Sequence, residues 1–166
     1  MRWTEGHIHV AMRKFLAQQG WLLFAGEYPG GSDHQLYPLN VVDPTLACDA
    51  SPDPRRHSLG ELIPDIVALR GDDLLIGEAK VLYNQDDRDK LVLLLTERRR
   101  DLLLALQKFA QERRVPDLLP VERLVMHPVL IFRATTDAPP LPSDFSYLRI
   151  VNKTDAYFEG PLGSIA

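Results

Sequence analysis

Apolar residues recur at helical spacing near the start of the chain. Ile8 and Leu16 belong to one apolar stripe, which predicts a first helix over roughly residues 5–19. Thr4 is a favourable residue to begin this helix, and Gly20 is a natural residue to end it.

A longer helical pattern follows the middle of the chain, from the polar segment at 85–87 to about Arg114. One face of it is apolar apart from Arg98. We expect one continuous helix here, with a break near Thr96 as the alternative for a pattern of this length.

Strands are predicted where Val, Ile and Leu are dense between Gly, Pro and Asp. They cover residues 21–28, 63–69, 74–81, 122–133 and 147–151. Pro128 predicts a bulge or an edge position for the fourth of these. The helix between the third and fourth strands predicts a right-handed crossover, which makes those two strands parallel. The fold class is therefore α/β, with a mixed sheet flanked by helices and the core order helix, strand, strand, strand, helix, strand.

The second and third strands form a predicted hairpin around the polar turn at 70–73. Counting back from this turn places Asp65 opposite Glu78 and Ile63 opposite Lys80. Directly opposed residues share a face of the sheet, with Cβ atoms roughly 4.5–5.5 Å apart. Two acidic side chains and a lysine are therefore expected on one side of the hairpin.

Opposed carboxylates repel each other, so this pairing destabilises the hairpin unless a cation lies between them. A divalent metal would remove the conflict, because Mg²⁺ takes oxygen ligands and commonly binds one or two carboxylates. The alternative is an ordinary hairpin whose acids are solvated. Apolar neighbours on both faces argue against that alternative, because buried strands seldom carry acids without a partner.

The segments Pro64-Asp65 and Glu78-Ala79-Lys80, on neighbouring strands, resemble the PD-(D/E)XK nuclease superfamily and its restriction-endonuclease-like fold. The core order of elements predicted above agrees with this resemblance. It implies that Asp65 and Glu78 hold Mg²⁺ or Mn²⁺, with the Ala79 carbonyl as a further ligand. Lys80 would orient a water molecule or stabilise developing negative charge.

The first helix offers one further acidic residue to this site. Many members of the superfamily carry an acid on this helix that joins the metal site, and Glu5 is the matching position. Glu5 lies on the stripe that faces the sheet, although it could equally serve to stabilise the start of the helix. His7 and His9 are expected to be surface or capping residues rather than ligands.

Composition sets the limits of these hypotheses. The 166 residues, 45% hydrophobic and 25% charged, fit a single domain over 1–166 with an insertion at about 32–60. No membrane span and no signal peptide are expected, so the predicted location is the cytoplasm. The single cysteine permits no internal disulfide.

The formal net charge of −4 gives no overall electrostatic signal for nucleic acid. Basic residues are nevertheless concentrated locally, with six basic and three acidic residues between 97 and 114. Arg98, Arg99 and Arg100 in that segment, and Arg55 and Arg56 in the insertion, are the candidate contacts to a phosphate backbone.

The function predicted from the sequence is metal-dependent hydrolysis of nucleic acid, with DNA favoured over RNA. A two-fold dimer would be natural for cutting both strands of a duplex. Two alternatives stay open: a non-catalytic nucleic-acid-binding or assembly subunit that keeps the fold, for example in a restriction or defence system, and a protein-interaction domain.

Overall fold

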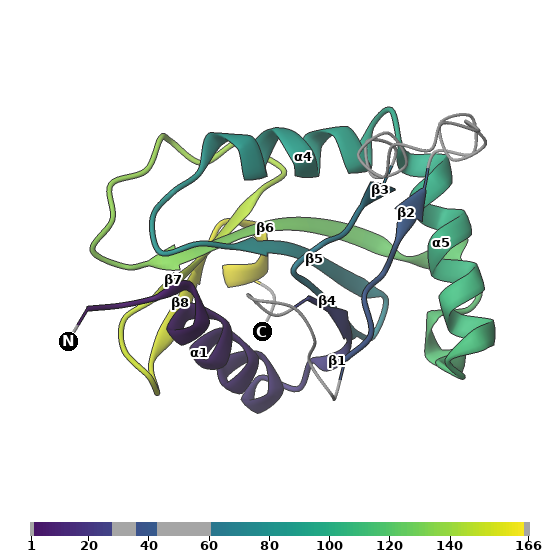
Figure 1. The fold of residues 1–166 in the computed structure, drawn as a ribbon, viewed down its shortest axis with the longest axis horizontal. Helices are drawn as coiled ribbons and strands as arrows, with labels where there is room; N and C mark the ends of the chain where they lie inside the picture. Colours follow the sequence, from purple (N-terminus) through teal and green to yellow (C-terminus); the bar gives the residue numbers. More distant parts are fainter. Residues whose placement is uncertain (1, 28–35, 43–60, 165–166) are drawn as a thin grey trace, which may run out of the picture.

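A mixed sheet forms the centre of the molecule (Figure 1). The computed structural model describes residues 2–27, 36–42 and 61–164, and within these six strands form the main sheet in the order β1-β4-β5-β6-β7-β8. The strands are β1 (Leu22–Gly26), β4 (Ile66–Arg70), β5 (Asp73–Ala79), β6 (Val125–Arg133), β7 (Ser146–Ile150) and β8 (Ala156–Glu159). β6 is parallel to both β5 and β7, and the other pairs are antiparallel. The α/β class with a mixed sheet is confirmed.

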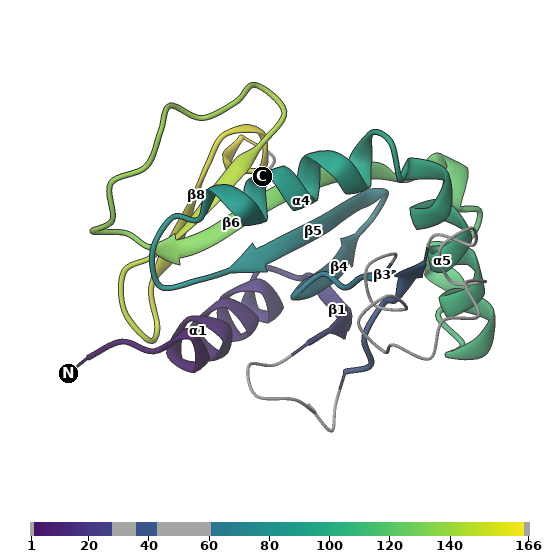
Figure 2. The same ribbon diagram turned by 45° about the horizontal axis from the view of Figure 1, so that its top comes forward.

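Helices cover both faces of this sheet (Figures 1 and 2). Helix α1 (Glu5–Gln18) lies on one face, while α4 (Gln85–Leu95) and α5 (Arg99–Glu112) lie on the other. Short 3₁₀ helices at Pro116–Leu118, Val121–Arg123 and Pro161–Gly163 complete the connections. Strands β2 (Val41–Val42) and β3 (Glu61–Leu62) form a small separate sheet beside α5.

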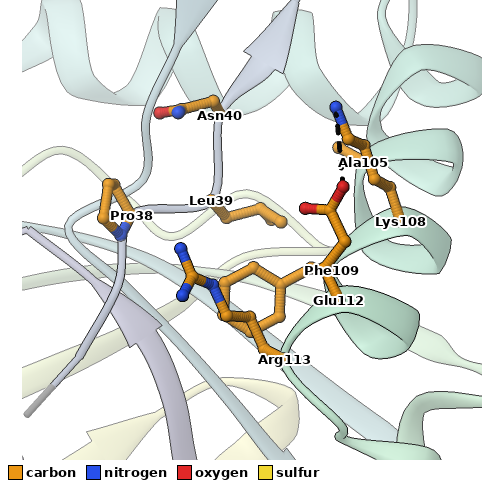
Figure 3. A pocket seen from close by; sticks show the side chains of 8 residues that line it. All are labelled: Pro38, Leu39, Asn40, Ala105, Lys108, Phe109, Glu112 and Arg113. Atoms are coloured by element: carbon orange, nitrogen blue, oxygen red, sulfur yellow. Dashed lines mark ion pairs between the residues drawn. The ribbon is translucent and has the colours of Figure 1, made fainter.

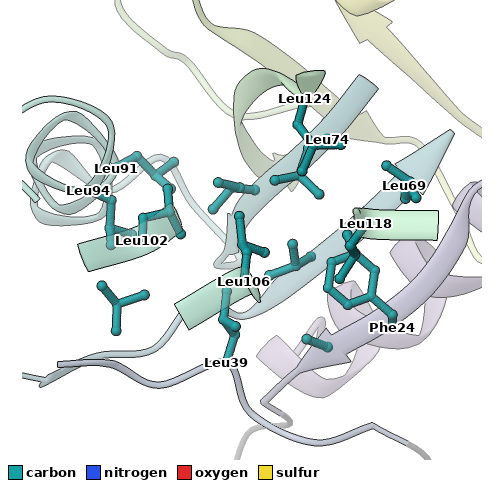
Figure 4. Packing of buried hydrophobic residues seen from close by; sticks show 14 of the residues in the cluster. Phe24, Leu39, Leu69, Leu74, Leu91, Leu94, Leu102, Leu106, Leu118 and Leu124 are labelled. Atoms are coloured by element: carbon teal, nitrogen blue, oxygen red, sulfur yellow. The ribbon is translucent and has the colours of Figure 1, made fainter. Parts of the chain in front are cut away.

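Each face of the sheet has its own apolar core. On the α1 side, Ile8 and Met12 pack against alternate sheet residues such as Ile66 and Leu75. The larger core on the opposite side contains leucines from both α4 and α5, as Figure 4 shows. Because β4 and β5 are covered on both faces, their sequences are almost continuously apolar. An acid in this hairpin therefore has little access to water unless it lies at the end of a strand.

The predicted register of the hairpin is confirmed. Arg70 pairs with Asp73 and Val67 with Ile76, as the count from the turn required. The parallel pairing of β5 with β6 is confirmed as well. Helix α1 begins after Thr4, whose side chain accepts a hydrogen bond from the His7 backbone.

The single long helix expected over 85–114 is wrong, because the chain breaks between α4 and α5. Thr96 leaves helical geometry with ψ at −89°, while its hydroxyl donates to the carbonyl of Val92 at 2.7 Å. The turn continues until the Arg98 guanidinium binds Asp101 in the first turn of α5. The break lets both helices direct their leucines toward the same core, which a straight helix of this length would not do.

The bulge expected at Pro128 is absent, because β6 pairs with β5 without a shift in register. Although β6 lies between β5 and β7, Pro128 does occupy a local edge position, because the pairing with β7 starts only after it. The N–H groups of odd-numbered residues in β6 face β5, as Val125 donating to Asp72 illustrates. Pro128 therefore turns its nitrogen toward β7, whose pairing begins only at Val129. A proline is tolerated there because β7 offers no carbonyl acceptor at this position, so no hydrogen bond of the sheet is lost.

One strand of the main sheet was not predicted: the segment after Asn152, which carries little signal, forms β8. Among the described residues, no helix combines the length and apolar character needed to cross a membrane.

Gly77, next to Glu78, provides a test of the packing on the α1 face. A Cβ at this position would lie 2.7 Å from Ile131 Cδ1 and 2.8 Å from Ile66 Cγ2. We expect Gly77→Ala to lower the free energy of unfolding by about 1–3 kcal/mol in urea titrations, because overpacking forces neighbours from their rotamers. The exposed control Leu104→Ala should change it by less than about 0.5 kcal/mol. Equal stability of wild type and Gly77→Ala would contradict this account.

Candidate metal centre

The acidic and basic side chains singled out in the sequence meet at the carboxyl end of β5. Asp65 directly precedes β4, Glu78 and Ala79 end the neighbouring strand β5, and Lys80 directly follows it. The first turns of α1 and α4 reach the same end of the sheet, which is where ligands commonly bind in open α/β sheets. Four separate segments of the chain therefore contribute to one site.

The carboxylates of Asp65 and Glu78 each accept a hydrogen bond from a backbone N–H group at or beside the other acid. The Asp65 N–H donates to Glu78 Oε2 at 3.0 Å, and the Ala79 N–H donates to Asp65 Oδ2 at 2.9 Å. Both side chains thus replace ladder bonds beyond the start of β4. Successive N–H groups of a strand point to opposite neighbours. The Ala79 N–H therefore faces Asp65, while the next N–H, of Lys80, donates to the Ile131 carbonyl in β6. The predicted convergence of the two acids is confirmed.

The Glu78 carboxyl is 2% exposed, and its environment favours the protonated form. Burial, and then the adjacent Asp65 carboxylate, raise the pKa of Glu78 from its ordinary value of 4.5 to about 9. The Lys90 ammonium lies directly against Glu78 Oε1 and lowers this pKa, but it does not outweigh the other two effects. Lys90 also donates to the Ile63 carbonyl at 2.6 Å.

Glu5 points toward the other acids rather than away from them. Its Oε1 accepts a hydrogen bond from Lys80 Nζ at 2.9 Å, and this bond raises the pKa of Lys80. Lys80 is 41% exposed and Glu5 35%, so the pair borders solvent. Glu5 is therefore part of the site, while the capping of α1 is performed by Thr4 together with His7.

His9 is buried at 1% exposure, so the expectation of a surface or capping residue is wrong for it, though correct for His7. Its Nε2 lies 3.9 Å from Asp65 Oδ2. One ligand atom from each of Glu5, His9 and Asp65 lies within 4.8 Å of the others. Burial lowers the pKa of His9 and outweighs the nearby Asp65 carboxylate, which raises it. The lowered pKa favours a neutral imidazole, the form that can bind a cation.

Sequence reasoning missed three residues of this site: His9, Asp87 and Lys90. His9 follows Glu5 by one helical turn, and this spacing was the available signal. Asp87 and Lys90 lie in the first turns of α4, which must begin close to the end of β5 because the connection is short. Burial raises the pKa of Asp87, which lies within electrostatic range of both Lys80 and Asp65.

The arginines predicted to contact nucleic acid lie elsewhere or outside the described part of the chain. Arg99 and Arg100 are exposed at the start of α5. The part of α4 from Asp87 to Leu95, about 12 Å long at 1.5 Å per residue, and the turn after it separate them from Asp87 along the chain. Arg98 is 11% exposed and bound to Asp101, whereas Arg55 and Arg56 lie outside the described residues.

A separate cavity of about 130 Å³ opens between α5 and the segment before β2 (Figure 3). Leu39 and Phe109 form its floor, and Lys108 is paired with Glu112 at its rim at 3.9 Å. The four acids Glu5, Asp65, Glu78 and Asp87 form the carboxylate cluster at the end of β5, and none of them lines this cavity. The cavity and the site at the end of β5 are therefore separate features of the molecule.

Comparison of the chain with known protein families, curated proteins and solved structures found no match in any of the three. The donor set itself fits a hard divalent cation, because it offers several carboxylates and a neutral imidazole close together. The imidazole is the one donor of this set that is not an oxygen ligand of the kind Mg²⁺ prefers.

The raised pKa of Glu78 gives a stability prediction for the metal-free protein. Between about pH 4.5 and about pH 9 the unfolded state loses the Glu78 proton while the folded state keeps it, so this residue makes stability fall as pH rises. We expect Glu78→Gln to match wild type near the lower limit and to be more stable at about pH 8, by at most about 1.4 kcal/mol per pH unit. Chemical denaturation across this range measures the difference, and a variant that is less stable than wild type at the alkaline end would contradict it.

Proposed function

We propose that this protein is a metal-dependent nuclease of the PD-(D/E)XK superfamily with a restriction-endonuclease-like core, and that DNA is its favoured substrate. One observation carries the proposal: Asp65 interacts with Glu78 and also lies within ligand distance of Glu5 and His9. Lys80, ion-paired beside them, completes the motif. The order α1, β1, β4, β5, helices, β6 supports the same proposal.

Each residue has a defined part in this hydrolysis. Asp65, Glu78 and Glu5 would hold Mg²⁺ or Mn²⁺, together with His9 and the Ala79 carbonyl. A cation held by these residues would supply activation of water and neutralisation of charge on a phosphate. Lys80 has enough exposure to reach a substrate phosphate, and its fixed positive charge stabilises the negative charge that develops during cleavage. The dimer expected from symmetry stays a prediction.

A specific observation favours a second function, that of a non-catalytic subunit. The Lys90 ammonium already lies against Glu78 and neutralises the carboxylate pair without a metal. If Lys90 holds this position permanently, the fold is stable with no cation and binds none at Glu78. Metal binding therefore separates the two functions.

The test combines cleavage with thermal melting. Wild type should cleave plasmid or single-stranded DNA with Mn²⁺ or Mg²⁺ and not with chelator, and Mn²⁺ should raise its melting temperature by mass action. Asp65→Asn should lose cleavage and most of the metal-dependent shift in melting temperature, because it removes the carboxylate that lies close to each of the other proposed side-chain ligands. Without metal it should melt at or above the wild-type temperature, since it relieves repulsion with Glu78 while its amide oxygen still accepts from Ala79.

The acid-to-amide control is Asp101→Asn, which removes a carboxylate far along the chain from the cluster and leaves the metal response unchanged. Lys90→Met addresses the second function, because it removes the internal cation. A metal-dependent shift that is absent in wild type and present only in Lys90→Met would establish the non-catalytic subunit.

Nucleic-acid binding should depend on salt if the basic start of α5 contacts the phosphate backbone. The double variant Arg99→Ala/Arg100→Ala should reduce the slope of log affinity against log salt by about 0.7–0.9 for each phosphate that is no longer neutralised. Fluorescence anisotropy with labelled DNA under chelation measures this slope. Binding to nucleic acid without any salt dependence would contradict the assignment and favour a protein-interaction role.

A further inference from the structure

A tryptophan, a histidine and an arginine lie together beside the carboxylate cluster. Trp3 precedes α1 by two residues, and Arg133 ends β6. The Arg133 backbone N–H donates to the carbonyl of Val81, the residue after Lys80, so the end of β6 adjoins the proposed site. All three side chains, Trp3, His7 and Arg133, are partly exposed.

These side chains form one group of planar rings and planar charge. The Arg133 guanidinium carbon lies 5.3 Å from the centre of the Trp3 ring, within the range of a cation–π interaction. The His7 ring approaches Trp3 edge-on, with centroids 5.8 Å apart and an angle of 70°. The His7 Nδ1 accepts from the Thr4 N–H at 2.9 Å, which fixes the imidazole. The group is therefore held in place before any ligand arrives.

The second tryptophan of the chain shows what a purely structural arrangement of this kind looks like. Trp21 also carries an arginine over its ring, with the Arg70 guanidinium carbon 4.7 Å from the ring centre. Trp21 is only 4% exposed, belongs to the core, and lies at the opposite end of the β4–β5 hairpin from Asp65. Trp3 differs in remaining partly exposed and in adjoining the proposed site.

We propose that Trp3, His7 and Arg133 bind an unpaired base of the nucleic acid, so that the strand entering the site is single-stranded at this point. This inference rests on the proposed nuclease function and names its substrate class. Aromatic rings and the guanidinium plane stack on nucleic-acid bases, while Arg133 and Lys80 supply positive charge for the adjoining phosphates. A base inside a duplex is already stacked on both faces, so it cannot also stack on these three side chains.

The two tryptophans permit a direct test of binding, separate from cleavage. In chelator, short oligothymidylate should quench the fluorescence of Trp21→Phe, in which Trp3 is the remaining tryptophan. The same oligonucleotide should leave the fluorescence of Trp3→Phe unchanged, because Trp21 is buried. A hairpin duplex of equal length should bind more weakly than the single strand to the wild-type protein.

Substitutions then connect the affinity to the three side chains. Trp3→Leu and Arg133→Ala should each weaken oligothymidylate binding about tenfold or more, in line with the cost of removing one stacked side chain. Trp3→Tyr should restore part of this affinity because it keeps an aromatic plane. Arg70→Ala is the matched control, since it removes the same charge from the other arginine–tryptophan pair and should leave affinity unchanged. Melting curves for every variant separate impaired binding from impaired folding.

The outcomes distinguish this inference from the proposed function. Metal-dependent cleavage with duplex bound as tightly as single strand, or with unchanged affinity in folded Trp3→Leu and Arg133→Ala, would overturn the inference and leave the nuclease. The absence of both binding and cleavage would overturn both. Single-strand binding that responds to Trp3 without any cleavage would support the inference for a non-catalytic subunit.

Discussion

The arrangement of the site depends on placing the Glu78 carboxyl at 2% exposure beside a second acid. Transferring an ionised carboxylate out of water is costly unless a cation or a set of hydrogen bonds compensates for it. This protein reduces the cost in three ways: the Asp65 N–H binds one Glu78 oxygen, Lys90 binds the other, and the pKa of Glu78 is raised. The surrounding fold must hold the Asp65 N–H and Lys90 in place, because these two groups compensate the Glu78 carboxyl whenever it is ionised.

Topology explains how elements distant in sequence supply these groups. The parallel pairing of β5 with β6 requires a crossover, and its first helix, α4, begins six residues after Ala79. Its early turns therefore hold Lys90 and Asp87 over the end of the strand. On the opposite face, α1 packs through Ile8 and Met12, which directs Glu5 and His9 toward the same strand end.

The sequence was sufficient for the hairpin and insufficient for the residues that cover it. Side chains in strands alternate with period two, so one turn at 70–73 determined the register as far as the pair of Ile66 with Gly77, which adjoin Asp65 and Glu78. The burial of His9 could not be derived in this way, because it depends on how α1 rotates against the sheet. The place of Lys90 likewise follows from packing of helices on the core, and the length of the helical pattern offered the break near Thr96 only as the alternative to a continuous helix. The weak segment that forms β8 is ordered by pairing with β7.

The charges of the cluster connect these observations to function. When ionised, the four acids Glu5, Asp65, Glu78 and Asp87 exceed the two lysines Lys80 and Lys90 by two negative charges, the charge that a divalent cation neutralises. Without a metal, protonation of Glu78 removes one of these two net charges. A cation that binds at Glu78 must therefore displace its proton and compete with Lys90, whereas at Glu5, His9 and Asp65 it meets a neutral imidazole and the Lys80 ion pair. Under the proposed function, the balance between Lys90 and a metal ion at Glu78 would therefore separate an enzyme from a stable, non-catalytic subunit.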